Sequence, residues 1–201
     1  MSEIPDLPVP VRVVLADANV LYSRVLRDDR LNAADEEVIT INWSDRILEE
    51  MAEHLVENVA GFTGESAERL VAAMNSTFPL AAIEPTTADY LELQSFALPD
   101  DDDRHVLAAV IAAEANVLCT ANTKDFPTDV AVALGFEVMN PDLLLSALIS
   151  EFPEQMLTAH AMVVAALKGA SDELVVAALQ RAGAPSAADL ISRLFTDESP
   201  G

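Results

Sequence analysis

The stretch Val11-Arg12-Val13-Val14-Leu15-Ala16 stops abruptly at Asp17, and it decides the fold class. The run is short, apolar and rich in β-branched residues, which predicts a buried β-strand. Residues 18–26 follow at once and can form a helix. A buried strand that leads directly into a helix is typical of the first unit of a parallel α/β sheet.

The same alternation continues along the chain. Short apolar runs at 81–84, 116–120 and 136–139 predict further strands. Helical patterns lie between and beside them, at 44–59, 66–78, 86–96, 106–115 and 141–149. Residues 44–59 begin at a helix entry, Trp43-Ser44-Asp45, with Ser44 as the N-cap. The order predicts an α/β fold with an open parallel sheet flanked by helices.

The chain divides into three parts by its patterns. Residues 1–10 hold three prolines and predict a loose, extended lead-in. Residues 11–150 carry the α/β pattern. Residues 151–201 show helical patterns only, broken by Gly169, Gly183 and Pro185, and predict an all-helical C-terminal extension.

The composition is strongly acidic. Lys and Arg number 11 and Asp and Glu number 34, so the formal net charge is −23. Such a field repels nucleic acid at long range, which disfavours a nucleic-acid partner unless basic residues gather locally. The single cysteine, Cys119, excludes a disulfide framework and a cysteine-based zinc site, and it is expected in the core.

No membrane or export signal is visible. The first residues lack a basic segment followed by an apolar one, and the longest central apolar stretch, Val106–Ala113, is far short of the roughly 18 residues that a membrane span needs. We therefore expect a soluble protein of the cytoplasm, with no membrane partner.

Acidic side chains follow the predicted strands where ligands bind in open α/β sheets. Asp17 follows the first strand, Asn122 and Asp125 follow the strand at 116–120, and residues 100–103 are four aspartates that precede a helix. Carboxylates that converge raise one another's pKa, and a hard divalent cation such as Mg²⁺ relieves the repulsion. Carboxylates with such a cation indicate phosphodiester hydrolysis.

Helical angles select among these acids only in part. Asp103 falls on the face of the 106–115 helix that carries its apolar residues, whereas Asp101 and Asp102 point elsewhere and are expected to be solvated. On the 44–59 helix, Glu49 and Glu50 border opposite sides of the apolar stripe. Periodicity does not decide between those two glutamates.

Four stretches resemble, in order, the acidic motifs of PIN-domain nucleases. They are residues 13–21 (VVLADANVL), 47–51 (ILEEM), 100–109 (DDDDRHVLAA) and 120–127 (TANTKDFP). The resemblance covers about residues 11–145. It implies a PIN-like nuclease domain at 11–150.

The resemblance also assigns roles to residues. It implies that Asp17, Glu50, Asp103 and Asp125 are the catalytic and metal-binding set, and the family pattern prefers Glu50 to Glu49. Thr120 resembles the family's small hydroxyl residue near the metal. Asn122 stands where many members carry an acid, so Asp125 is expected to substitute for that acid, with Asn122 in support.

The implied activity is hydrolysis of RNA by an activated water, with Mg²⁺ or Mn²⁺ as cofactor. Many small bacterial members are VapC-like toxins of toxin–antitoxin pairs. The resemblance therefore implies a cognate antitoxin as a partner, and a homodimer.

Six of the eleven basic residues lie near these acidic motifs in sequence. Arg24, Arg27 and Arg30 would share one helix face if the first helix extends that far. Arg46 precedes Glu50 by one turn. Arg104 and Lys124 adjoin Asp103 and Asp125, respectively. We expect a local positive rim that binds phosphate, with Arg24, Arg27, Arg30, Arg104 and Lys124 as the substrate-binding residues. Ordinary ion pairing with nearby acids is the alternative for each.

Other interpretations stay open at this point. A PIN-like fold with weak or no nuclease activity could be a binding or regulatory module, and a DNA-directed nuclease is a third class, although no helical arch is visible. His105 is expected to be an ordinary surface or packing histidine, with contact to the substrate as the alternative. The 151–201 extension could pack on its own domain, form a dimer contact or receive an antitoxin. Packing is the default, because short helices are marginal alone.

Overall fold

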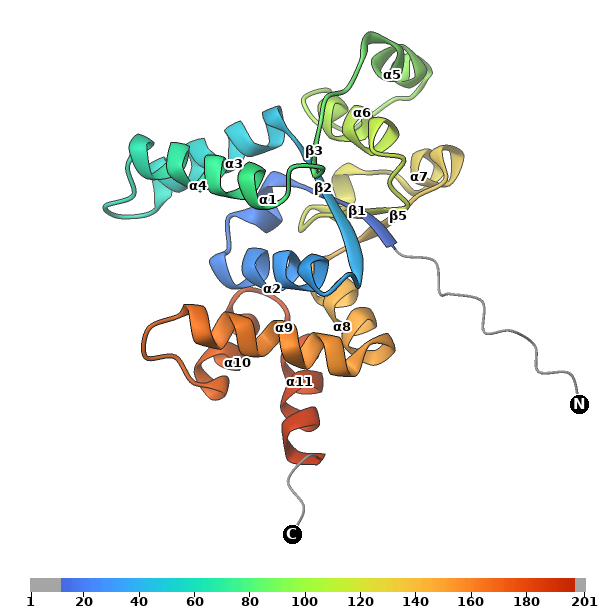
Figure 1. Cartoon of the computed structure of the whole chain (residues 1–201). Helices are drawn as coiled ribbons and strands as arrows, with labels where there is room; N and C mark the ends of the chain where they lie inside the picture. Colours follow the sequence, from blue (N-terminus) through green and yellow to red (C-terminus); the bar gives the residue numbers. More distant parts are fainter. Residues whose placement is uncertain (1–11, 198–201) are drawn as a thin grey trace, which may run out of the picture.

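The computed structural model describes residues 12–197, and within them five strands form one parallel sheet (Figure 1). The strand order is β3-β2-β1-β4-β5, so β1 lies at the centre. The strands are β1 (Arg12–Ala16), β2 (Ile39–Ser44), β3 (Ala82–Ile83), β4 (Val117–Cys119) and β5 (Glu137–Met139). All four pairings between neighbouring strands are parallel. The predicted fold class is confirmed.

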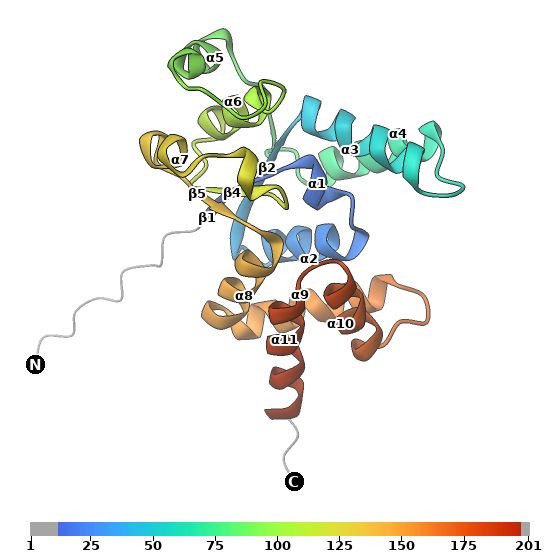
Figure 2. The same ribbon diagram turned by 180° about the vertical axis from the view of Figure 1, so that it is seen from behind.

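Helices connect and flank these strands. Those of the sheet region are α1 (Ala18–Leu21), α2 (Arg24–Asp35), α3 (Asp45–Asn58), α4 (Gly64–Thr77), α5 (Thr87–Glu92), α6 (Arg104–Ala112), α7 (Thr128–Leu134) and α8 (Pro141–Glu151), with short 3-10 turns η1 (Leu93–Ser95) and η2 (Thr123–Asp125). Helices α3 and α4 run side by side and project from one side of the sheet, while α5 and α6 lie at the end opposite the C-terminal helices (Figures 1 and 2).

Strand β2 is absent from the sequence prediction, which places only a helix entry at Trp43. The structure shows an extended segment up to Ser44, which is both the last strand residue and the N-cap of α3. Ser44 accepts a hydrogen bond from the backbone N–H of Ile47. The β-branched run Val38-Ile39-Thr40-Ile41 is the signal that identifies this strand.

The first predicted helix is also corrected. Residues 18–26 form two helices rather than one, because Ser23 adopts an extended conformation between α1 and α2. The second helix then continues to Asp35, well beyond the predicted end.

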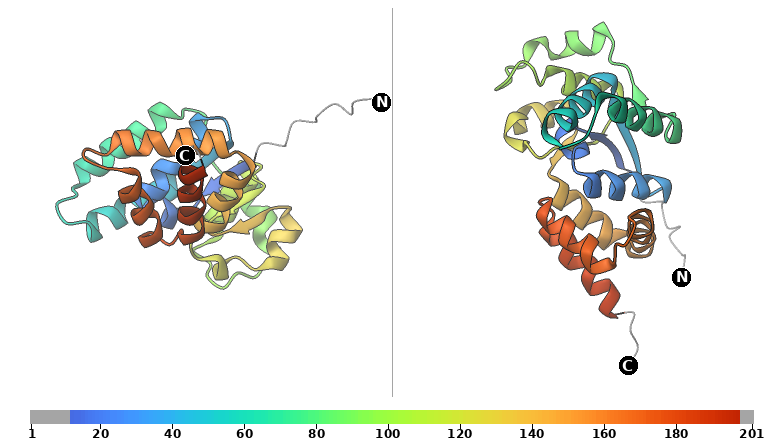
Figure 3. Two further views of the ribbon diagram at one scale, coloured as in Figure 1. Left: turned by 90° about the horizontal axis from the view of Figure 1, so that it is seen from below. Right: turned by 90° about the vertical axis from the view of Figure 1, so that its left-hand side faces the viewer.

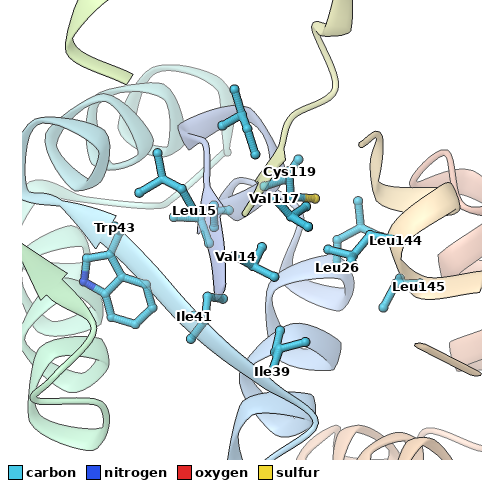
Figure 4. Close-up of a cluster of buried hydrophobic side chains, with 14 of the residues drawn as sticks. Val14, Leu15, Leu26, Ile39, Ile41, Trp43, Val117, Cys119, Leu144 and Leu145 are labelled. Carbon is cyan, nitrogen blue, oxygen red and sulfur yellow. The ribbon is translucent and has the colours of Figure 1, made fainter. Parts of the chain in front are cut away.

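The core lies on both faces of β1 and its neighbours (Figure 4). Val14, Leu15, Trp43 and Leu144 have no exposed surface. Burial of each such large apolar side chain stabilises the fold by roughly 1.5–3 kcal/mol. The indole N–H of Trp43 donates to Asn75 Oδ1 at 2.9 Å, so its polar atom is satisfied inside the protein. Cys119 is fully buried, as expected.

The C-terminal extension is helical, as predicted, and packs on the sheet region. It comprises α9 (Pro153–Ala166), α10 (Asp172–Arg181) and α11 (Pro185–Asp197). Helix α9 packs against α2 and α11 packs against α8, and Figure 3 shows α2 between the sheet and these helices. Asn32 Nδ2 on α2 donates to the carbonyl of Ala159 at 3.3 Å. No helix within residues 12–197 combines the length and the apolar character that a bilayer crossing requires.

Candidate active site

Asp17 stands at the carboxyl end of the central strand. Its backbone N–H donates to the carbonyl of Cys119 at 3.0 Å, which continues the pairing of β1 with β4 by one residue. Its side chain caps α1, because Oδ1 accepts from the backbone N–H of Ala18 at 2.7 Å. Only 6% of the residue is exposed. The fold therefore fixes this carboxylate at the edge where ligands of parallel sheets bind.

A polar network holds Asp17 from the neighbouring strand. The hydroxyl of Thr120, the residue after β4, donates to Asp17 Oδ2 at 2.7 Å. The same hydroxyl accepts from Asn19 Nδ2 at 2.9 Å and from the backbone N–H of Asn122 at 3.0 Å. Asn19 also donates to Asp17 Oδ2, and its Oδ1 accepts from the backbone N–H of Ala121. The threonine thus uses its donor and both acceptor positions, which locks the Asp17 carboxylate in one orientation.

Glu50 faces α6, whereas Glu49 faces outward. Glu50 Oε1 lies 3.1 Å from Arg46 Nε and 3.1 Å from His105 Nε2, and 28% of its side chain is exposed. Glu49 is 63% exposed and lies 3.6 Å from Arg46. Of the two glutamates that periodicity could not separate, Glu50 is therefore the one beside the N-terminal turn of α6.

Asp103 directly precedes α6, and its carboxylate does not cap that helix. It is the N-cap residue, yet its side chain makes no capping hydrogen bond. Its pKa is raised to about 6, first by burial and then by the charges of Asp125, Asp17, Asp100 and Glu50. Asp101 and Asp102 are exposed. The charges that raise this pKa come from separate parts of the chain, so their carboxylates lie within electrostatic range of Asp103.

The pKa of Asp17 is also raised by its environment. Its pKa is raised by burial, with Glu50 adding to the increase, while the hydrogen bonds from Thr120 and Ala18 oppose it. Burial also raises the pKa of Glu50, against the effect of Arg46. Each carboxylate is therefore less stable in its ionised form here than in water.

A tight turn places Asp125 near the carboxyl edge of the sheet. Residues 123–125 form η2, and the backbone N–H of Asp125 donates to the carbonyl of Asn122 at 3.1 Å. Asp125 is half-buried, whereas the side chain of Asn122 is exposed. The turn brings Asp125 within electrostatic range of Asp103.

The donor set fits a hard divalent cation in chemical type, because all four side chains offer carboxylate oxygens. Within residues 12–197, however, no three acidic, histidine or cysteine side chains are arranged as a group that could hold a metal ion. In this structure the oxygens of Asp17 accept from Asn19 and Thr120, and Glu50 contacts Arg46 and His105. A cation at this site therefore requires a change of side-chain position, above all at Glu50.

Burial corrects part of the expected basic rim. Arg30 has no exposed surface and Arg27 is 7% exposed. Arg27 Nη1 donates to the carbonyl of Leu21 at 2.8 Å, and Arg30 donates to the carbonyl of Leu26. The guanidinium of Arg30 is enclosed and that of Arg27 nearly so, and this structure therefore leaves little of either for contact with a substrate. Arg24 is 63% exposed and lies 3.4 Å from Asp28.

The two other predicted substrate-binding residues differ from each other. Arg104 holds the loop before α6, because it donates to the carbonyls of Leu93 and Phe96 and pairs with Asp101 at 2.7 Å. Lys124 is exposed, and it makes no ion pair or side-chain hydrogen bond to any other residue in the described part of the chain. Lys124 is thus the cation beside the acidic cluster that is available to an anion.

The sequence analysis assigned no role in the site to three nearby residues. Asn19 lies inside the first motif but received no role. His105, expected to be a packing residue, contacts Glu50, and its Nδ1 is buried without a partner. Burial and Arg46 lower the pKa of His105, against Asp17 and Asp102. Tyr22 stacks on His54 with ring centroids 3.8 Å apart, and its pKa is raised by burial, Asp17 and Glu50.

The raised pKa of Asp103 predicts a pH-dependent penalty on stability. Protonation is favoured in the folded state, so stability falls as the pH rises from the unfolded pKa near 3.8 through the folded pKa of about 6. In a chelating buffer, Asp103→Asn should raise the melting temperature at pH 7.5 and lose that advantage at pH 4. Thermal unfolding measured by circular dichroism tests this. Asp189→Asn, at an exposed position on α11, is the control, and an equal effect of Asp103→Asn at both pH values contradicts the prediction.

Comparison with known proteins agrees with this arrangement. The PIN domain family matches residues 12–124, more than half of the chain. Asp17, Glu50 and Asp103 lie inside the matched stretch, and Asp125 follows it directly. Searches of curated proteins and of solved structures found no match. PIN domains are generally nucleases, and the parallel sheet with acids at its carboxyl edge fits that class. The chain belongs to the PIN domain family.

Proposed function

We propose that this protein is a metal-dependent ribonuclease that hydrolyses RNA phosphodiester bonds, with Asp17, Glu50, Asp103 and Asp125 as the catalytic and metal-binding residues. The observation that carries the proposal is the electrostatic convergence of these carboxylates, which raises the pKa of Asp103 to about 6. Groups whose pKa is shifted by burial and by specific charges concentrate at functional sites. Such a cluster costs stability, and a cation compensates for that cost.

Mg²⁺ or Mn²⁺ would be held by oxygens of these four side chains, and when bound it supplies activation of water and stabilisation of charge on the phosphate. The chain's own residues prepare the site. Thr120 and Asn19 fix the orientation of the Asp17 carboxylate. Arg46 and His105 hold Glu50 within electrostatic range of Asp103.

Few positively charged side chains near the acidic cluster are available to contact the substrate. The net charge of −23 repels RNA at long range, but salt confines such fields to about 8–10 Å under physiological conditions. Lys124, next to Asp125 in the η2 turn, is exposed and offers a positive charge to a phosphate. Arg104 supports the site indirectly, because its guanidinium fixes the loop that presents Asp103.

We also propose that the protein acts in the cytoplasm as the toxin of a toxin–antitoxin pair, with a cognate antitoxin and a homodimeric state. The support is the resemblance of its four acidic motifs to those of VapC-like toxins, together with its membership of the PIN domain family.

One observation favours a second candidate, a PIN-like binding or regulatory module with weak nuclease activity. Glu50 is engaged by Arg46 and His105 rather than by the other acids, and Asn122 replaces an acid of the family pattern. If these contacts persist when a cation is present, the site lacks one of its ligands.

Loss of Asp17 tests the ribonuclease. With Mn²⁺ or Mg²⁺ and a single-stranded RNA, Asp17→Asn should lower the cleavage rate by at least about 100-fold, because loss of even an outer-shell metal contact costs 10–100-fold. The rate is measured from product bands under single-turnover conditions. Induced expression in a bacterial host should arrest growth for the wild type and not for Asp17→Asn, if the protein is a toxin.

The matched control is Asp189→Asn, which removes an exposed carboxylate from α11 and should leave cleavage unchanged. Equal cleavage by wild type and Asp17→Asn would show that the activity comes from elsewhere. No cleavage by the wild type with either metal would support the binding module instead.

The two lysines of the chain form a natural pair for testing RNA contact. Lys124 lies beside the acidic cluster, and Lys168 is exposed in the C-terminal extension. Lys124→Gln should weaken RNA binding and reduce the slope of log affinity against log salt by about 1, as expected for one lost phosphate contact. Lys168→Gln should change neither. Fluorescence anisotropy with labelled RNA and the Asp17→Asn background, which prevents cleavage, measures both; equal effects of the two changes would remove Lys124 from the proposed site.

A further inference from the structure

Helix α3 carries a row of acids along its side next to α4. Asp45, Glu49, Glu53 and Glu57 are each four residues apart, so they form one stripe along the helix. Like charges at this spacing destabilise a helix. The stripe spans 13 residues, or about 18 Å at the rise of an α-helix.

The stripe borders an apolar groove between α3 and α4. The groove has a volume of about 520 Å³, and its apolar lining comes from small and medium side chains of both helices, namely Leu48, Ala52, Val56, Ala67 and Val71. Val56 is 41% exposed. Glu68 on α4 stands on the opposite wall, so carboxylates flank the apolar floor on both sides.

The protein itself hardly neutralises these acids. Arg46 contacts Glu49 but lies closer to Glu50, and Arg69 on α4 pairs with Glu65, which is outside the groove. Asp45, Glu53, Glu57 and Glu68 have no ion pair within residues 12–197. The groove therefore combines an accessible apolar floor with an unpaired negative rim.

We propose that this groove binds an amphipathic helix of another protein, with apolar residues on the inserted face and Lys or Arg along its edges. Charge complementarity identifies the partner, because only a cationic edge relieves the repulsion along the stripe. The apolar floor receives the inserted face, as in other complexes where a helix lies in a groove. The length of the stripe fits three to four turns of a partner helix.

A second copy of the chain offers no such helix among the described residues. Exposed Lys and Arg side chains in 12–197 never occur twice on one helix, because Arg27 and Arg30 of α2 are buried and only Arg24 remains. Nucleic acid is repelled by the rim. The groove therefore points to a basic protein partner, and this partner binds independently of the proposed RNA cleavage.

A designed peptide tests the groove directly. The probe is a fluorescent 18-residue amphipathic helix of Leu, Ala and Lys, and a scrambled peptide of the same composition is its control. Binding to the full chain is measured by fluorescence anisotropy at physiological salt. The helical peptide should bind in a saturable 1:1 complex, and the scrambled peptide should bind at least about tenfold more weakly, since it cannot present one apolar face.

Matched double variants separate the groove from the general charge of the protein. Glu53→Gln with Glu57→Gln should weaken binding by roughly tenfold, as should Val56→Asn on the groove floor. Glu154→Gln with Asp189→Asn removes the same charge from exposed positions in the C-terminal extension and should change affinity by less than about twofold. Asp17→Asn should bind the peptide like the wild type, which keeps this test apart from that of cleavage.

Three outcomes of the peptide-binding measurements would overturn the proposal. They are absence of binding by the helical peptide, equal binding of the helical and scrambled peptides, and equal losses in the two double variants. Concentration-dependent dimerisation that Val56→Asn abolishes would assign the groove to a second copy and would also overturn it. Circular dichroism is the control for folding of each variant. We expect every variant to fold, because the substituted groove side chains are exposed.

Discussion

Repulsion between carboxylates is the constraint on which the active-site edge of this protein depends. Parallel strands all end at the same edge of the sheet, so the residues that follow β1 and β4 meet there together with the acids of α3 and of the loop before α6. This arrangement does not stabilise the fold, because burial and mutual repulsion make the ionised forms of these carboxylates less stable. A cation that binds several of these oxygens turns the same arrangement into a favourable one.

The site is fixed at one side and adjustable at the other. Asp17 is held by strand pairing, by the helix it caps and by Thr120 and Asn19. Glu50 is held by partners that a cation could displace, Arg46 and His105. Asp103 makes no capping bond. Asp17 is therefore the most tightly held of the acids, with hydrogen bonds from the backbone, Thr120 and Asn19.

The sequence predicts the central strand and the acids at its edge well, because a buried parallel strand is a continuous apolar run that ends at a polar residue. Asp17 follows such a run, and Asp103 shares the apolar face of its helix. Strand β2 was missed because the helix-entry signal at Ser44 overlaps the last strand residue. Periodicity could not separate Glu50 from Glu49, since it places them on opposite borders of the stripe. The family resemblance preferred Glu50, and its contact with His105 of α6 distinguishes it in the structure.

The remaining differences come from tertiary packing, which periodicity does not report. Arg27 and Arg30 were expected on the surface, yet both are buried and bond to carbonyls within the first helices. Helix α2, which carries both arginines, packs against α9, more than a hundred residues later in the chain. His105 was expected to pack without a role, and it contacts Glu50 because α3 and α6 approach each other at the sheet edge.

Direct measurement of Mn²⁺ binding tests the central claim that this acidic edge is a cation site. Free Mn²⁺ is counted by electron paramagnetic resonance during titration of the full chain at physiological salt, which suppresses unspecific attraction to the net charge of −23. The wild type should bind Mn²⁺ at a defined stoichiometry, and Asp103→Ala should bind at least about tenfold more weakly, while Asp189→Ala behaves like the wild type. Identical binding curves for all three proteins would contradict the account.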